Sequence, residues 1–97
     1  MEVTFKMLGK KIPYLNVIDI RDSYLFKNKH IVGSENVPYQ FLLINPDDYL
    51  NKSTTYYIVC EYGLKSGMVS NILNKNGYKT HSIKGGIKEY FNNIKDR

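Results

Sequence analysis

The only cysteine in the chain, Cys60, lies where an apolar run gives way to a polar, glycine-containing segment. Residues 54–60 are β-branched and aromatic over their length, which is typical of a buried strand. In an open parallel sheet, ligands bind beyond the carboxyl ends of the strands, where loops lead into helix N-termini. Backbone N–H groups and the positive end of a helix dipole favour a negatively charged sulfur there. The position predicts that Cys60 acts as a thiolate nucleophile.

The residues after Cys60 have the types that an anion-binding loop needs. Gly63 permits the positive φ of a tight cradle, Lys65 supplies a cation, and Ser66 can cap the following helix or hydrogen-bond the bound group. A cysteine at the end of a buried strand can also be a plain core residue, but a core residue has no need of such a loop. The predicted substrate-binding residues are Glu61, Tyr62, Gly63, Leu64, Lys65 and Ser66.

The elements that would position this loop alternate between strand and helix along the chain. Short strands are predicted at residues 16–20, 34–38, 54–60 and 80–83, and helical segments at 22–28, 39–45, from about Ser66 to Asn76, and at 85–91. Asn76-Gly77 supplies the left-handed residue that commonly ends a helix. The alternation predicts an α/β layered domain with a mostly parallel sheet.

Composition sets limits on the class of protein. The 97 residues, 42% of them hydrophobic, are enough for one small domain over 1–97. The formal charge of +5 comes from scattered lysines with no run longer than two, so we expect no nucleic-acid partner. No apolar run approaches membrane-spanning length, and no signal peptide is visible. With a single thiol, the expected location is the reducing cytoplasm.

Short motifs along the chain resemble those of the rhodanese-like domain family, a sulfurtransferase fold. The resemblance rests on Asp19-Ile20-Arg21, His30-Ile31, Gly33-Ser34, Asn36-Val37-Pro38, the loop from Cys60 to Ser66, Gly77-Tyr78 and Gly85-Gly86-Ile87. It implies a three-layer α/β sandwich around a five-stranded, mainly parallel sheet. It also implies that the cysteine accepts a sulfane sulfur as a persulfide, with no metal and no organic cofactor.

Four positions depart from the pattern that is usual in that family. Lys65 replaces an arginine, which keeps the charge but loses the planar bidentate fork. Lys29 stands in place of a glycine, Leu25 in place of an acidic residue, and Tyr90 in place of a tryptophan. These changes weaken the expectation of efficient thiosulfate chemistry more than they weaken the expectation of the fold.

Loop length argues against a related chemistry. Cysteine-dependent phosphatases that resemble rhodaneses place five residues between the cysteine and an arginine. Here four residues separate Cys60 from Lys65, and Ser66 occupies the position that the arginine would need. A zinc site is not expected either, because His30, His81 and one cysteine show no C-x-x-C or H-x-x-x-H spacing.

Three residues are expected to support the site. Asp19 and Arg21 can be an acid and a cation at a site, but an ion pair or capping contacts at the end of a strand is the favoured interpretation. His30 is expected to hydrogen-bond backbone near the following loop. The predicted function is transfer of a sulfane sulfur from a small anionic donor, thiosulfate or a persulfide, to a thiol, protein or cyanide acceptor. The alternative is a binding or redox-sensing module that keeps the fold without the turnover.

Overall fold

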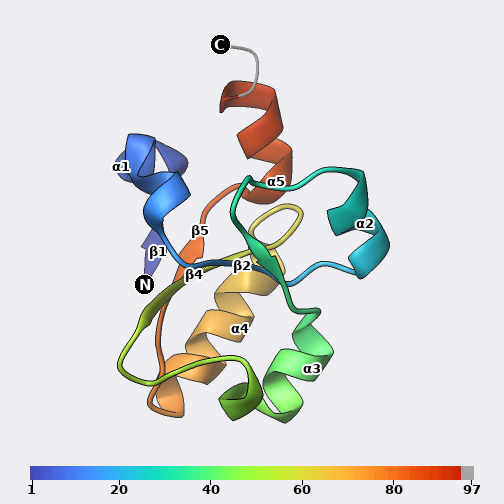
Figure 1. Cartoon of the computed structure of the whole chain (residues 1–97). Coiled ribbons are helices and arrows are strands. Elements are labelled where there is room, and N and C mark those ends of the chain that lie inside the picture. Colours follow the sequence, from blue (N-terminus) through green and yellow to red (C-terminus); the bar gives the residue numbers. More distant parts are fainter. Residues whose placement is uncertain (95–97) are drawn as a thin grey trace.

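A five-stranded sheet with the order β1-β5-β4-β2-β3 forms the middle layer of the molecule (Figure 1). The computed structural model describes residues 1–94. Every neighbouring pair of strands is parallel. The predicted α/β class is therefore confirmed, and the sheet is wholly rather than mainly parallel. The strands are β1 Glu2–Val3, β2 Val17–Asp19, β3 Glu35–Asn36, β4 Thr55–Val59 and β5 Lys79–Ile83.

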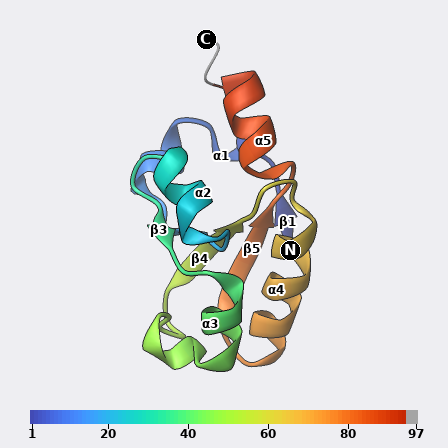
Figure 2. The ribbon, with the colours of Figure 1, turned by 90° about the vertical axis from the view of Figure 1, so that its right-hand side faces the viewer.

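Helices cover both faces of the sheet, as the two perpendicular views show (Figures 1 and 2). In these views α3 and α4 lie on one side, and α1 and α5 lie on the other. The α-helices are α1 Phe5–Leu8, α2 Ser23–Asn28, α3 Tyr39–Ile44, α4 Leu64–Lys75 and α5 Gly86–Glu89. Two 3₁₀ segments, Gly9–Tyr14 and Pro46–Asp48, and a π-helical turn, Tyr90–Ile94, complete the described part of the chain.

The alternation of side chains along the central strands divides the core into two clusters. Ile18 and Ile58 face the cluster under α3 and α4, whereas Val17 and Val59 face the cluster under α1 and α5. This division follows from the period of two in a strand, which sends successive side chains to opposite faces. Because both faces are covered, β2 and β4 carry buried apolar side chains on both faces.

The predicted elements are present, with shifts at their ends. Helix α4 begins at Leu64, slightly before the expected start, and its C-terminus is closed at Gly77, whose φ is 95°. The helix expected over 85–91 is α-helical only to Glu89 and then continues as the π-helical turn. No element was predicted in the first fifteen residues, where the structure has β1, α1 and a 3₁₀ segment that contains Pro13.

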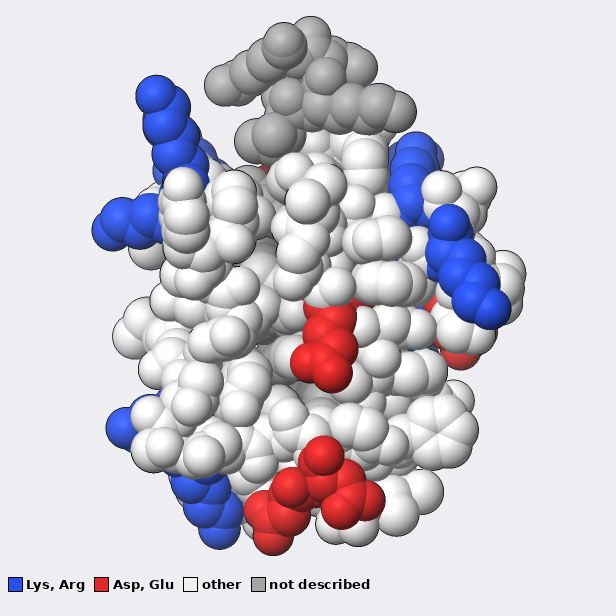
Figure 3. All heavy atoms as spheres, viewed as in Figure 1, with Lys and Arg blue, Asp and Glu red and all other residues white. Residues whose placement is uncertain are grey.

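Charged side chains are dispersed over the surface. On the face shown in Figure 3, basic side chains lie at separate places near the margin and form no continuous patch. Acidic side chains are visible near the middle and at the lower edge of that face. Among the described residues, no helix is long and apolar enough to cross a membrane.

Candidate active site

The sulfur of Cys60 lies at the junction between β4 and α4. Cys60 follows Val59, the last residue of β4, and is 5% exposed. Its Sγ accepts hydrogen bonds from the backbone N–H groups of Gly63 at 3.1 Å and Ser66 at 3.2 Å. The N-cap residue of α4, Gly63, has no side chain that could accept a hydrogen bond, so the sulfur takes the place that an N-cap oxygen usually has. The contacts favour negative charge on Sγ.

The loop leaves further donors at the start of α4. The first N–H groups of a helix have no acceptor inside the helix. Within the described residues, the N–H groups of Leu64 and Lys65 have no hydrogen-bond acceptor. Gly63 makes the turn with φ 93°, a backbone conformation that residues with a side chain rarely adopt. The turn therefore gathers backbone donors that can bind an anion.

The other side of the loop is fastened to the start of α5. The N–H of Ile87 donates to the carbonyl of Cys60 at 2.8 Å, and the N–H of Lys88 donates to that of Glu61 at 3.0 Å. Gly86 lies so close that a Cβ there would be 2.4 Å from the Cys60 oxygen. The double glycine thus allows the start of α5 to pack closely against the cysteine loop. The sequence pattern alone did not reveal this role.

Arg21 connects the end of β2 to the same loop. Its guanidinium donates to both carboxylate oxygens of Asp19, which is fully buried, and to the carbonyl of Lys29 at 2.7 Å. Its Nη1 donates to Glu61 Oε1 at 3.0 Å. Burial by itself lowers the pKa of Arg21, but the hydrogen bonds and charges of Asp19 and Glu61 outweigh it and raise the pKa. The expected Asp19–Arg21 ion pair is present and extends to the loop.

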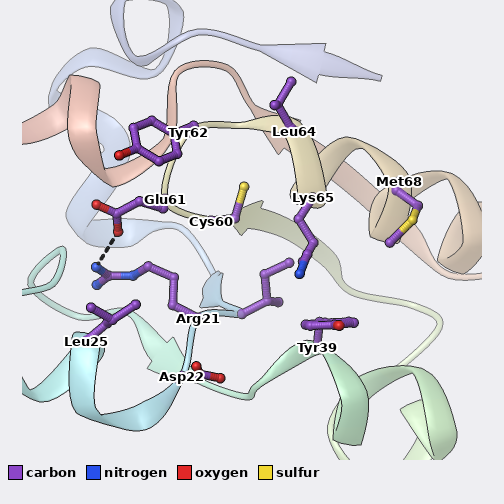
Figure 4. Close-up of a pocket in the computed structure, with 11 residues that line it drawn as sticks. Arg21, Asp22, Leu25, Tyr39, Cys60, Glu61, Tyr62, Leu64, Lys65 and Met68 are labelled. Atoms are coloured by element: carbon purple, nitrogen blue, oxygen red, sulfur yellow. Dashed lines mark hydrogen bonds and ion pairs between the residues drawn. The ribbon is translucent and has the colours of Figure 1, made fainter.

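A cavity of about 520 Å³ opens beside the sulfur (Figure 4). Six of the predicted site and supporting residues line it, while Gly63, Ser66, Asp19 and His30 do not. The lining consists of Ile20, Arg21, Asp22, Leu25, Tyr39, Cys60, Glu61, Tyr62, Leu64, Lys65 and Met68.

Lys65 reaches across this cavity toward α3. Its Nζ lies over the ring of Tyr39, 4.1 Å from the ring centroid, as Figure 4 shows. An ammonium over an aromatic face is held by the ring quadrupole. The predicted cation therefore faces the site, but it already has a partner in the protein.

The structure gives different outcomes for Ser66 and His30. Ser66 lies inside α4, whose N-cap is Gly63, so the cap role expected of this side chain is wrong. Its hydroxyl contacts the carbonyl of Gly63 and the Ser82 hydroxyl, and its N–H donates to Cys60 Sγ. A contact with a bound group stays a prediction. His30 makes the expected backbone contact, with Nδ1 2.7 Å from the carbonyl of Phe26, and its ring stacks on the Phe26 ring. That contact belongs to α2 rather than to the cavity.

Five lining residues were not among the predicted site residues: Ile20, Asp22, Leu25, Tyr39 and Met68. Tyr39 follows the loop after β3, so the rule that ligands bind at the carboxyl ends of parallel strands could have indicated it. Met68 carries no such signal, because its pattern in α4 equally suits a core residue.

A model of the "Rhodanese-like domain" family matches residues 5–93. The chain belongs to the rhodanese-like domain family. A crystal structure of a Staphylococcus saprophyticus protein superposes with a TM-score of 0.85 at 30% identity, with 97% of both chains covered.

Two curated relatives come from Bacillus subtilis. The chain is 30% identical to "Uncharacterized protein YqhL" over 81% of its own length. It is 29% identical to "Putative sulfur carrier protein YrkF" over 67% of its own length. The aligned region spans 63% of the first relative and 35% of the second. These relatives therefore contain sequence beyond the aligned region.

Proposed function

We propose that this rhodanese-like domain is a sulfurtransferase that carries a sulfane sulfur as a persulfide on Cys60. The observation that supports it most directly is the contact of Cys60 Sγ with two backbone N–H groups at the start of α4, beside an open cavity. Such donors favour the thiolate, which is the nucleophilic form of cysteine.

The proposed reaction has two halves. In the first, the Cys60 thiolate attacks the outer sulfur of thiosulfate or of a persulfide. The donor S–S bond breaks, sulfite or a thiolate leaves with the electron pair, and a new S–S bond forms on Cys60. In the second, a thiolate or cyanide attacks the terminal sulfur, and the Cys60 thiolate is the leaving group. The sulfur moves without any external oxidant or reductant.

The surrounding residues have separate roles in this proposal. The N–H groups of Leu64 and Lys65, which have no other acceptor in the described chain, bind the charge on the terminal sulfur. Arg21 holds Glu61 and thereby fixes the loop. The N-terminal end of α5 holds the loop from the other side. Family membership and the similarity to a relative named as a sulfur carrier support this assignment.

Mass spectrometry tests the proposal. We expect incubation with thiosulfate or with an organic persulfide to add the mass of one sulfur atom to Cys60, and dithiothreitol to remove it. Cys60→Ser is the matched control and should gain no mass. If neither donor leaves sulfur on Cys60, the sulfurtransferase assignment is wrong.

A binding or redox-sensing module is the second candidate. It is favoured by the engagement of Lys65 with Tyr39 and by the carboxylate of Glu61 beside Cys60, since both reduce attraction for an anionic donor. The same experiment separates the two functions. A redox sensor would form a glutathione adduct with oxidised glutathione and no persulfide with either donor.

A further inference from the structure

The cavity beside Cys60 is much larger than a small inorganic anion requires. Its volume of about 520 Å³ lies within the range of pockets that enclose drug-sized organic ligands. Apolar or aromatic side chains make up much of its wall, among them Ile20, Leu25, Tyr39 and Met68. Covering such a wall favours binding only when the ligand brings an apolar group that removes it from water.

The charged groups of the cavity are poorly arranged for a doubly charged donor. All three guanidinium nitrogens of Arg21 donate within the protein, to Asp19, Glu61 and the Lys29 carbonyl. The ammonium of Lys65 lies on Tyr39, and moving it to a ligand would give up that contact. Glu61 adds a carboxylate to the lining, and its side chain is 36% exposed. A dianion therefore finds no uncommitted cation among the described lining residues and meets one negative charge.

We infer that the sulfur donor of this site is a small organic persulfide with an apolar substituent, rather than thiosulfate. The inference rests on the proposed sulfurtransferase function and specifies its substrate class. In the donor R–S–SH, the Cys60 thiolate attacks the terminal sulfur, the S–S bond of the donor breaks, RS⁻ leaves with the electron pair, and a new S–S bond forms on Cys60. The apolar R group lies against the wall formed by Leu25, Tyr39 and Met68.

Three probes that share one reacting group test this inference. Thiosulfate, methanethiosulfonate and benzenethiosulfonate all present a sulfane sulfur on an SO₂ group, and they differ in carrying an oxygen anion, a methyl or a phenyl substituent. Attack by Cys60 releases sulfite or the corresponding sulfinate and leaves the same persulfide. Dividing each kcat/KM by the rate constant of that probe with free cysteine removes differences in intrinsic reactivity.

We expect the corrected kcat/KM to rise from thiosulfate to methanethiosulfonate to benzenethiosulfonate. The last step should be at least about tenfold, because a few buried carbons already give such discrimination. Met68→Ala should reduce the phenyl-to-methyl preference roughly 3–10-fold. Ile72→Ala is the matched control, since Ile72 lies one turn further along α4, is similarly exposed and does not line the cavity. It should leave the preference unchanged.

Glu61→Gln tests the charge argument, since glutamine can still accept from Arg21. It should raise kcat/KM for dianionic thiosulfate by about 2–5-fold, and less for the monoanionic methanethiosulfonate. Equal corrected values for all three probes, or a phenyl preference that survives Met68→Ala, would overturn the inferred substrate class while leaving sulfur transfer intact. Absence of a Cys60 persulfide with every probe would overturn the proposed function and this inference with it.

Discussion

At the scale of single residues, the site depends on two polar groups that are removed from water. Cys60 Sγ is buried and bonded to two backbone N–H groups, and Asp19 is fully buried and bonded to Arg21. Each is compensated by a specific partner, because an uncompensated buried charge is strongly destabilising. Substitutions at these residues should therefore separate chemistry from stability.

Cys60→Ser should abolish sulfur transfer and leave the fold unchanged. The serine oxygen can accept the same N–H groups and is close to sulfur in volume, but it cannot form a persulfide. Transfer from a sulfane donor to cyanide measures the activity, and circular dichroism with thermal unfolding measures the fold. Transfer retained by a folded Cys60→Ser protein would contradict the proposed mechanism.

Arg21→Met should lower the free energy of unfolding by about 3–5 kcal/mol, because it leaves Asp19 charged and buried without its partner. Adding Asp19→Asn should recover part of this loss, since the orphaned charge is then removed. Urea unfolding of the two single variants and the double variant completes the cycle. A double variant no more stable than Arg21→Met would show that the charge of Asp19 is not the cause.

At the scale of elements, the cysteine loop is a junction of three chain segments. It ends β4, begins α4 and receives hydrogen bonds from the start of α5. Arg21 adds a contact from the end of β2. The loop is therefore fixed by packing from several sides rather than by its own sequence alone.

Gly86→Ala should destabilise the protein by at least about 1–3 kcal/mol, because φ is 65° and the new Cβ would meet backbone oxygen of the loop. It should also slow sulfur transfer by displacing Cys60. Gly67→Ala is the control: it lies within α4 with nothing within 4 Å of an added Cβ, and it should stabilise by about 0.5–1 kcal/mol. Chemical unfolding measures the stability of the two variants, and sulfur-transfer assays measure their rates. Equal effects of the two alanines would contradict the proposed α5 contact.

The sequence predicted the elements whose signals are local. The β-branched run of β4 and the glycine that closes α4 identify those elements without tertiary information. The N-terminal strand Glu2–Val3 escaped prediction because two residues are too few to show alternation. The 3₁₀ segment Gly9–Tyr14 has no strong periodic signal and contains a proline.

Only the part of the site whose signal is local in the sequence was predicted. The loop after Cys60 carries its signal in consecutive residues, whereas the contact between Arg21 and Glu61 joins residues forty positions apart. The placement of Tyr39 and Met68 around the cavity depends on how α3 and α4 pack against the sheet. Such contacts follow from strand order and helix packing, which the sequence pattern alone did not specify.

At the scale of the whole molecule, Tyr78 links two segments that are distant in the sequence. It lies just before β5, at the end of the sheet away from the cysteine loop, and contacts the segment Pro46–Asp48. Its hydroxyl donates to Asp47 in the 3₁₀ segment Pro46–Asp48, and its buried ring packs in the cluster under α3 and α4. The hydrogen bond to the Asp47 carboxylate, together with burial and the negative charge, raises the pKa of Tyr78 to about 12.

This shift predicts a loss of stability in strong alkali. The protonated phenol is favoured in the folded state, so its contribution is complete below the ordinary tyrosine pKa of about 10. It should be lost as pH rises from about 10 to about 12. At pH 9 the parent should have a larger free energy of unfolding than Tyr78→Phe, and this difference should shrink by pH 12. Urea unfolding across this range measures it, and a constant difference would contradict the coupling.

The pairing of β1 with β5 has a consequence for synthesis on the ribosome. Glu2 aligns with Ser82 and Val3 with Ile83, so β1 is synthesised long before the strand with which it pairs. This edge of the sheet cannot form until β5 has emerged, and loop-closure entropy delays contacts so distant in sequence. Until then β4 presents an unpaired edge, which a chaperone or a neighbouring nascent chain can contact first.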